Sequence, residues 1–193
     1  MAGRNLHEAY QNFISPMSEA LHCITEVPLI VRERNRLVTD TPFSVTLGKM
    51  DPVLLKGEAP LHLTVGQRIR IIRTEDPSDV RGPFKIRTID YIYLLATTDD
   101  DEIPNFQWTP EDRADETANV VTFPHLHLGP ALTGSKPQIR PKNLHKAHIP
   151  TGRVSLEAVI RLAIVEFGVR PHRQDWDAVL QRTEAAFMEW RTR

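Results

Sequence analysis

Two histidines separated by one leucine, His125 and His127, stand in the segment FPHLHLG. Successive side chains of an extended strand point to opposite faces. The alternation therefore predicts both imidazoles on one strand face, with Leu126 and Leu128 on the other. Two neighbouring imidazoles suit three uses: acid–base catalysis, metal ligation, or a plain solvated sheet face.

The charge distribution around this segment favours an anionic ligand. From Thr117 to Leu156 the sequence contains no acidic residue, although an even spread of its 25 acids would place about five there. The preceding stretch, 99–116, holds eight acids against the single base Arg113. The acid-free stretch suits phosphate-bearing ligands first of all, and the alternative is a basic segment that merely faces the acidic one. Its cations and histidines are Lys136, Arg140, Lys142, Lys146, Arg153, His125, His127, His145 and His148.

A histidine pair can cleave RNA without a metal. One imidazole takes the proton of the 2′-hydroxyl and another protonates the leaving 5′-oxygen, while a lysine or arginine stabilises the charge that develops on phosphorus. The segment HKAHIPTGRVS supplies such groups and leads into a helix start at Ser155, where free backbone amides bind anions. Our leading hypothesis is a metal-independent endoribonuclease with no cofactor. In it His125 and His127 are base and acid, His145 or His148 are alternates, and Lys146 and Arg153 bind phosphate.

Metal ligation is an alternative reading of the same residues. Histidines at alternate strand positions offer two imidazoles to one ion, and imidazole suits zinc, iron, nickel and copper. His145 or His148 could complete an all-histidine site. The absence of nearby acids disfavours a bound cation, so the sequence predicts no metal, with a histidine-ligated metalloprotein as the alternative.

Several function classes find no support in the chain. It has no glycine-rich phosphate loop and no nucleophile elbow, and its single Cys23 excludes an internal disulfide and a cysteine zinc cluster. No apolar run approaches the roughly 18 residues of a membrane span, and the first ten residues lack the pattern of a signal peptide. We therefore expect a cytoplasmic protein with no membrane partner. Its 193 residues, 40% hydrophobic and 25% charged, fit one globular domain.

The two ends of the chain indicate helices. The stretch 6–27 has a helical pattern that we expect to break near Pro16, with Ser15 capping the second piece. The rest of region 1–60 reads as irregular, apart from one strand in PFSVTLG. Region 155–193 predicts a pair of amphipathic helices, the first capped by Ser155 and ended at Gly168. This pair could also mediate oligomerisation.

Region 61–128 predicts an antiparallel sheet. The segments LHLTVGQRIRIIR, FKIRTIDYIYLLA, IPNFQWT and ANVVTFPHLHLG are closely spaced strands that alternate or are rich in β-branched residues. The apolar phase slips between Ile86 and Ile89, which predicts a bulge. Pro124 indicates an edge position or a bulge in the last strand. Region 129–154 is a basic, histidine-rich link, and the whole chain, 1–193, forms one α+β domain with four to six strands, N-terminal helices and the C-terminal pair packed on the sheet.

A resemblance follows from the segments DYIYLL, NFQWTP and PHLHLG, which are separated by an acidic turn and followed by a basic link into helices. Between Ile86 and Phe167 this arrangement resembles the TumE-like toxins of bacterial toxin–antitoxin systems. The resemblance implies a cytoplasmic bacterial toxin that a DNA-binding antitoxin neutralises, with Tyr91, Tyr93, His125 and His127 at the comparable positions. A further hypothesis is a non-catalytic binding partner in a toxin–antitoxin or defence operon.

Overall fold

A long antiparallel pair of strands, β5 (Leu61–Arg73) and β6 (Phe84–Thr97), forms the centre of the protein. The computed structural model describes residues 2–32, 37–74, 82–109, 121–129 and 147–190. The ladder between the two strands runs from Leu61 opposite Thr97 to Arg73 opposite Phe84. Its register shifts between Arg68 and Ile69, which leaves Ile89 as the extra residue of a bulge. The predicted slip in this strand is confirmed.

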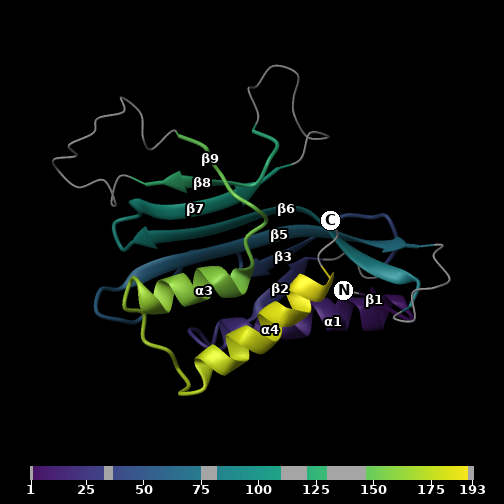
Figure 1. Cartoon of the computed structure of the whole chain (residues 1–193), viewed down its shortest axis with the longest axis horizontal. Coiled ribbons are helices and arrows are strands. Elements are labelled where there is room, and N and C mark those ends of the chain that lie inside the picture. Colours follow the sequence, from purple (N-terminus) through teal and green to yellow (C-terminus); the bar gives the residue numbers. More distant parts are fainter. Residues whose placement is uncertain (1, 33–36, 75–81, 110–120, 130–146, 191–193) are drawn as a thin grey trace.

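The sheet has nine strands in the described residues, and the predicted α+β class is confirmed (Figure 1). Its main path is β2-β3-β5-β6-β7-β8-β9, while β1 pairs with β6 and β4 with β5. The estimate of four to six strands was too low, because region 1–60 contributes four strands where we expected helices or irregular structure. Strands of two to five residues hold too few positions for alternation to be recognised. The remaining strands are β1 (Ala2–Gly3), β2 (Leu29–Arg32), β3 (Phe43–Leu47), β4 (Val53–Leu55), β7 (Glu102–Trp108), β8 (His125–Leu128) and β9 (Ile149–Pro150).

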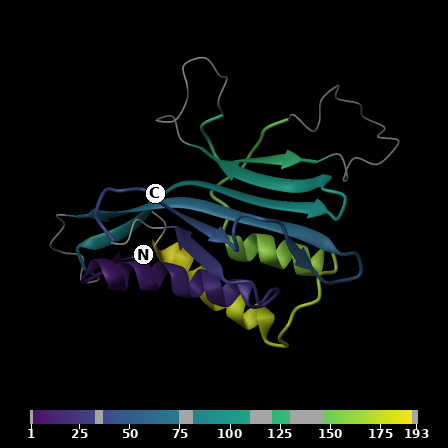
Figure 2. The same ribbon diagram turned by 180° about the vertical axis from the view of Figure 1, so that it is seen from behind.

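Three helices lie along one side of the sheet in both views (Figures 1 and 2). They are α1 (Leu6–Leu21), α3 (Leu156–Val165) and α4 (Trp176–Trp190). Between helices and sheet lies the core, which is lined by alternate side chains of β5 and by one stripe of each helix. Full burial of each such leucine or isoleucine contributes about 1.5–3 kcal/mol. Fully buried examples are Leu63, Ile69, Ile71, Leu21, Ile160 and Leu180.

Helix α1 is continuous through Pro16, so the predicted break is wrong. The helix begins after Asn5, whose side-chain oxygen accepts a hydrogen bond from the Glu8 amide at 2.9 Å. Ser15 caps nothing, since its hydroxyl bonds to the Gln11 side chain of the preceding turn. Proline deletes one backbone hydrogen bond, but residues on both sides of it are buried against the sheet. That burial holds the helix together where local sequence indicates a stop.

The C-terminal helices form as predicted and pack on the sheet side by side. The Ser155 hydroxyl accepts from the Ala158 amide at 3.0 Å, as an N-cap should, and donates to Glu184 of α4 at 2.6 Å. Gly168 follows α3 with φ +67°, a left-handed conformation that glycine adopts readily. Dimerisation through these helices stays a prediction. Among the described residues, no helix is both long and apolar enough to cross a membrane.

A close backbone contact ties the end of α3 to the strand pair β4–β5. Gly57 bridges Val169, and the Glu58 amide donates to the Gly168 carbonyl at 3.1 Å. A methyl group on Gly57 would lie 2.4 Å from the Gly168 carbonyl oxygen, well inside van der Waals contact. Only glycine fits this position without a shift of one backbone segment.

Replacing Gly57 with alanine should therefore destabilise the protein. We expect Gly57→Ala to lower the free energy of unfolding by about 1–3 kcal/mol, the usual range for overpacking. Urea denaturation followed by circular dichroism measures the change. Gly152→Ala is the matched control, since a methyl group there meets no atom within 4 Å. Equal stability of the two variants would contradict this account of the contact.

Candidate functional site

Three histidines converge at the β8–β9 edge of the sheet. His125 and His127 belong to β8, and the pairing of Leu126 with Ile149 places His148, the residue before β9, opposite His127. The ring centroids lie 4.9 Å apart for His125–His127 and for His125–His148, and 4.6 Å apart for His127–His148. One ring nitrogen of each can be chosen so that the three lie within 4.8 Å of one another. We call His125, His127 and His148 the histidine cluster.

The histidine cluster lies on the sheet face opposite the helices. His127 pairs with Asn105 of β7 and His125 with Gln107, while Leu126 pairs with Phe106. Phe106 in turn pairs with Tyr93, a core residue on the helix-covered face. Since directly paired residues project to the same face, the two histidines share the outer face and Leu126 the inner one. The alternation predicted from HLHL is confirmed.

Gly129 fixes the register of the histidine strand. Its amide donates to the Ile103 carbonyl at 2.6 Å. A side chain here would overlap the neighbouring strand, because a methyl group on Gly129 would lie 1.8 Å from the Glu102 carbonyl oxygen. The glycine at the end of FPHLHLG thus lets the chain leave β8 close to β7 while both histidines keep their places.

A backbone hydrogen bond sets the orientation of the His125 ring. This side chain is buried, and its Nδ1 lies 2.9 Å from the Phe123 carbonyl oxygen. A carbonyl only accepts, so Nδ1 carries a proton and Nε2 of the neutral ring presents a lone pair. That lone pair faces Nε2 of His127 at 3.1 Å. His148 is exposed, so the histidine cluster can be reached from solvent.

This geometry fits the requirements of a tetrahedral metal site. Zinc–nitrogen bonds of 2.0–2.1 Å at tetrahedral angles place two ligand nitrogens about 3.3–3.4 Å apart, close to the 3.1 Å between His125 and His127. Ligating histidines characteristically donate their other ring N–H to a carbonyl or carboxylate, as His125 does to Phe123. Asn105, opposite His127, adds a buried side-chain oxygen that accepts from no donor in the described part of the chain.

The remaining predicted site residues are elsewhere or outside the described residues. His145 and Lys146 belong to segment 130–146, which the structure does not describe. The Arg153 guanidinium lies 4.1 Å above the ring of Trp108. Trp108 pairs with Tyr91, on the helix-covered face. The structure therefore brings His125, His127 and His148 together and places Arg153 on the other side of the sheet.

The two tyrosines singled out by the resemblance also face the helices. The rings of Tyr91 and Tyr93 stack with centroids 4.9 Å apart. The Tyr91 hydroxyl accepts from the Val154 amide at 3.3 Å. The tyrosine and histidine positions of the resemblance consequently lie on opposite faces of one sheet and cannot meet at one reacting group.

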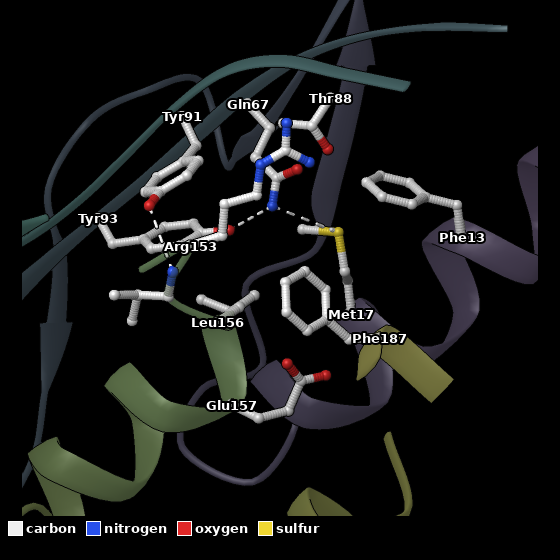
Figure 3. Close-up of a pocket in the computed structure, with 11 residues that line it drawn as sticks. Phe13, Met17, Gln67, Thr88, Tyr91, Tyr93, Arg153, Leu156, Glu157 and Phe187 are labelled. Carbon is white, nitrogen blue, oxygen red and sulfur yellow. Dashed lines mark hydrogen bonds between the residues drawn. The ribbon is translucent and has the colours of Figure 1, made fainter. Parts of the chain in front are cut away.

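Tyr91 and Tyr93 line a pocket between the sheet and the helices, which we call the inner pocket (Figure 3). Its volume is about 480 Å³. The sequence analysis missed its polar residues Gln67 and Glu157. A signal was available, because Gln67 occupies an inward position of β5 between Val65 and Ile69, where apolar residues otherwise stand. Its lining is Phe13, Met17, Gln67, Thr88, Tyr91, Tyr93, Arg153, Val154, Leu156, Glu157 and Phe187.

Glu157 of α3 is a buried carboxyl group, 3% exposed. Burial raises its pKa from 4.5 to about 6, and the negative charge of Glu184 acts in the same direction. Hydrogen bonds from the backbone and from Thr183 oppose the rise. In the folded protein Glu157 therefore holds its proton to a higher pH than in the unfolded chain.

This difference predicts how stability depends on pH. Between pH 4.5 and about 6 the folded state binds more protons than the unfolded state, so the contribution of Glu157 to stability falls as pH rises. Above pH 6 the loss levels off at about 2 kcal/mol. Glu157→Gln should therefore raise the free energy of unfolding by about that amount at pH 8 and leave it nearly unchanged at pH 4.5. Urea denaturation at both pH values measures this, and a gain of equal size at both would refute the assignment.

No protein-family model matches the chain, and no curated protein or solved structure is similar to it. The resemblance to TumE-like toxins gains no support from these comparisons and stays a prediction. What the site does is therefore inferred from its own residues.

Proposed function

We propose that the histidine cluster holds one divalent transition-metal ion of the zinc type and that the protein acts through this ion. The observation that carries the proposal is the convergence of three imidazoles, with nitrogens within 4.8 Å of one another, one of them oriented by a backbone carbonyl. Neutral imidazole nitrogens bind zinc, copper, nickel and iron without help from a carboxylate. The acid-free sequence around the histidines, which disfavoured a metal, is therefore no obstacle to this donor set.

The number of ligands points to a reactive site and not to a structural one. Structural zinc sites use four protein ligands, whereas catalytic sites use three and leave a position for water or substrate. The exposed His148 lies on the solvent side of the histidine cluster, so a small substrate can approach. A zinc-type ion supplies Lewis-acid chemistry, which polarises a carbonyl or phosphoryl oxygen and lowers the pKa of water.

Metal analysis of the purified protein tests the proposal. We expect one zinc ion per chain after dialysis against zinc, and substitution of His125, His127 or His148 by alanine should weaken binding by more than the 10–100-fold that loss of an outer-shell partner costs. Titration against a chelating dye measures the affinity. His62→Ala is the matched control, because His62 pairs with Asp100 and lies outside the histidine cluster. Equal zinc affinity of all four variants and the wild type would refute the site.

A second candidate is the metal-independent ribonuclease of a toxin–antitoxin pair in the bacterial cytoplasm. The observation in its favour is the 3.1 Å contact between Nε2 of His125 and Nε2 of His127. Such a contact needs one donor and one acceptor, which are the states that a general acid and a general base require. Arg153 lies on the other face, so the cation for the phosphate would have to come from another residue, with Lys146 the candidate from the sequence. A DNA-binding antitoxin would be the partner.

Cleavage of RNA in excess chelator separates the two candidates. If the ribonuclease proposal holds, wild type degrades total RNA with EDTA present and His127→Ala loses at least 100-fold in rate, within the range that one acid–base group contributes. Expression in bacteria should then arrest growth for wild type alone, and coexpression of the antitoxin should relieve the arrest. His62→Ala is again the control. Cleavage that EDTA abolishes and zinc restores would favour the metal site, and no cleavage in either condition would remove the ribonuclease proposal.

A further inference from the structure

The inner pocket has the size and the wall chemistry of a small-molecule site. Ligand pockets are typically about 300–1,000 Å³, mostly apolar, with a few placed polar groups, and this one holds about 480 Å³. It lies on the sheet face opposite the histidine cluster. Helices α1, α3 and α4 and strands β5 and β6 all contribute side chains to it (Figure 3).

Gln67 presents an unused hydrogen-bond acceptor in this pocket. The residue is 7% exposed, and its Nε2 donates to the Tyr93 hydroxyl and contacts Met17 Sδ at 3.8 Å. These contacts fix the amide, yet its Oε1 is fully buried and accepts from no donor among the described residues. Buried carbonyl oxygens are normally paired. A bound molecule with an N–H or O–H group would satisfy it.

Arg153 gives the same part of the pocket a positive charge. Its guanidinium packs over Trp108 at 4.1 Å and lines the pocket beside Tyr91. Stacking on an aromatic ring restricts the guanidinium while leaving its edge available for a carboxylate. Figure 3 shows Arg153 and Gln67 at one end of the pocket and Glu157 at the other. A single acidic group would accordingly be favoured at the Arg153 end and disfavoured near Glu157.

The walls between these ends suit a flat apolar body. Four aromatic side chains border the space, and Met17 and Leu156 complete the apolar lining. Aromatic rings pack well against such walls through offset or edge-on contacts, and methionine sulfur adapts to their edges. The four aromatic residues are Phe13, Tyr91, Tyr93 and Phe187.

We propose that the inner pocket binds a small aromatic carboxylate that carries one hydrogen-bond donor. The carboxylate pairs with Arg153, the donor bonds to Gln67 Oε1, and the ring lies among the aromatic walls. This site is separate from the histidine cluster and does not depend on the function proposed for it.

Three probes that differ by one group each test the inference on the intact protein. Indole-3-acetate has both the carboxylate and the N–H, 1-naphthylacetate lacks the N–H, and 3-methylindole lacks the carboxylate. Isothermal titration should show one site for indole-3-acetate, with the other two binding about tenfold more weakly, the loss expected for one buried hydrogen bond or ion pair. Failure of wild type to bind any probe, or equal binding of all three, overturns the proposal without any variant.

Two substitutions then assign each group. Gln67→Leu should remove the preference for indole-3-acetate over 1-naphthylacetate, and Arg153→Gln should remove the preference for carboxylates over 3-methylindole. Arg170→Gln, at an exposed position, should change neither preference. His127→Ala should leave all three affinities unchanged whether or not the histidine cluster binds metal. Preferences that survive both pocket substitutions would overturn the assignment.

Discussion

The ladder between β5 and β6 is the constraint on which the rest of the structure depends. It is the longest pairing in the sheet, and β1, β3, β4 and β7 all attach to one of its two strands. The bulge at Ile89 changes the phase of β6, so that Ile86 on one side of it and Tyr91 and Tyr93 on the other all reach the core. Without that extra residue, strict alternation would turn the two tyrosines or Ile86 outward. The inner pocket exists because the bulge turns both groups toward the helices.

The sequence predicted those parts of the fold that repeat over many residues. Strands β5 and β6 have enough positions for alternation to be unambiguous, and Ser155 and Gly168 mark the first C-terminal helix with local chemistry that few other structures need. Pro16 misled, because a local rule on helix ends was overridden by burial on both sides of the proline. The short strands of region 1–60 were missed for the opposite reason: what defines them is pairing with β3, β5 and β6, which no local pattern records.

The same division holds for the candidate site. That His125 and His127 share a face follows from a two-residue period and could be predicted. That His148 joins them depends on the two-residue strand β9, which pairs with β8 after a segment of 20 residues, and nothing in the spacing distinguishes His148 from His145. Arg153 was assigned to the histidines by closeness in sequence. Five residues of chain are enough to carry it to the other side of the sheet, where it meets Trp108.

The alternation of β8 also says which hereditary changes this protein can absorb. At Leu126 and Leu128 another apolar side chain of similar volume keeps the inner face packed and leaves the outer imidazoles in place. Loss of a single codon inside the strand is a different event, because it exchanges the two faces beyond that point. Without Leu126, one of the two imidazoles would turn inward toward Phe106 and the other would lose its neighbour. Over evolutionary time the length of this strand should thus be held more strictly than the identity of its leucines.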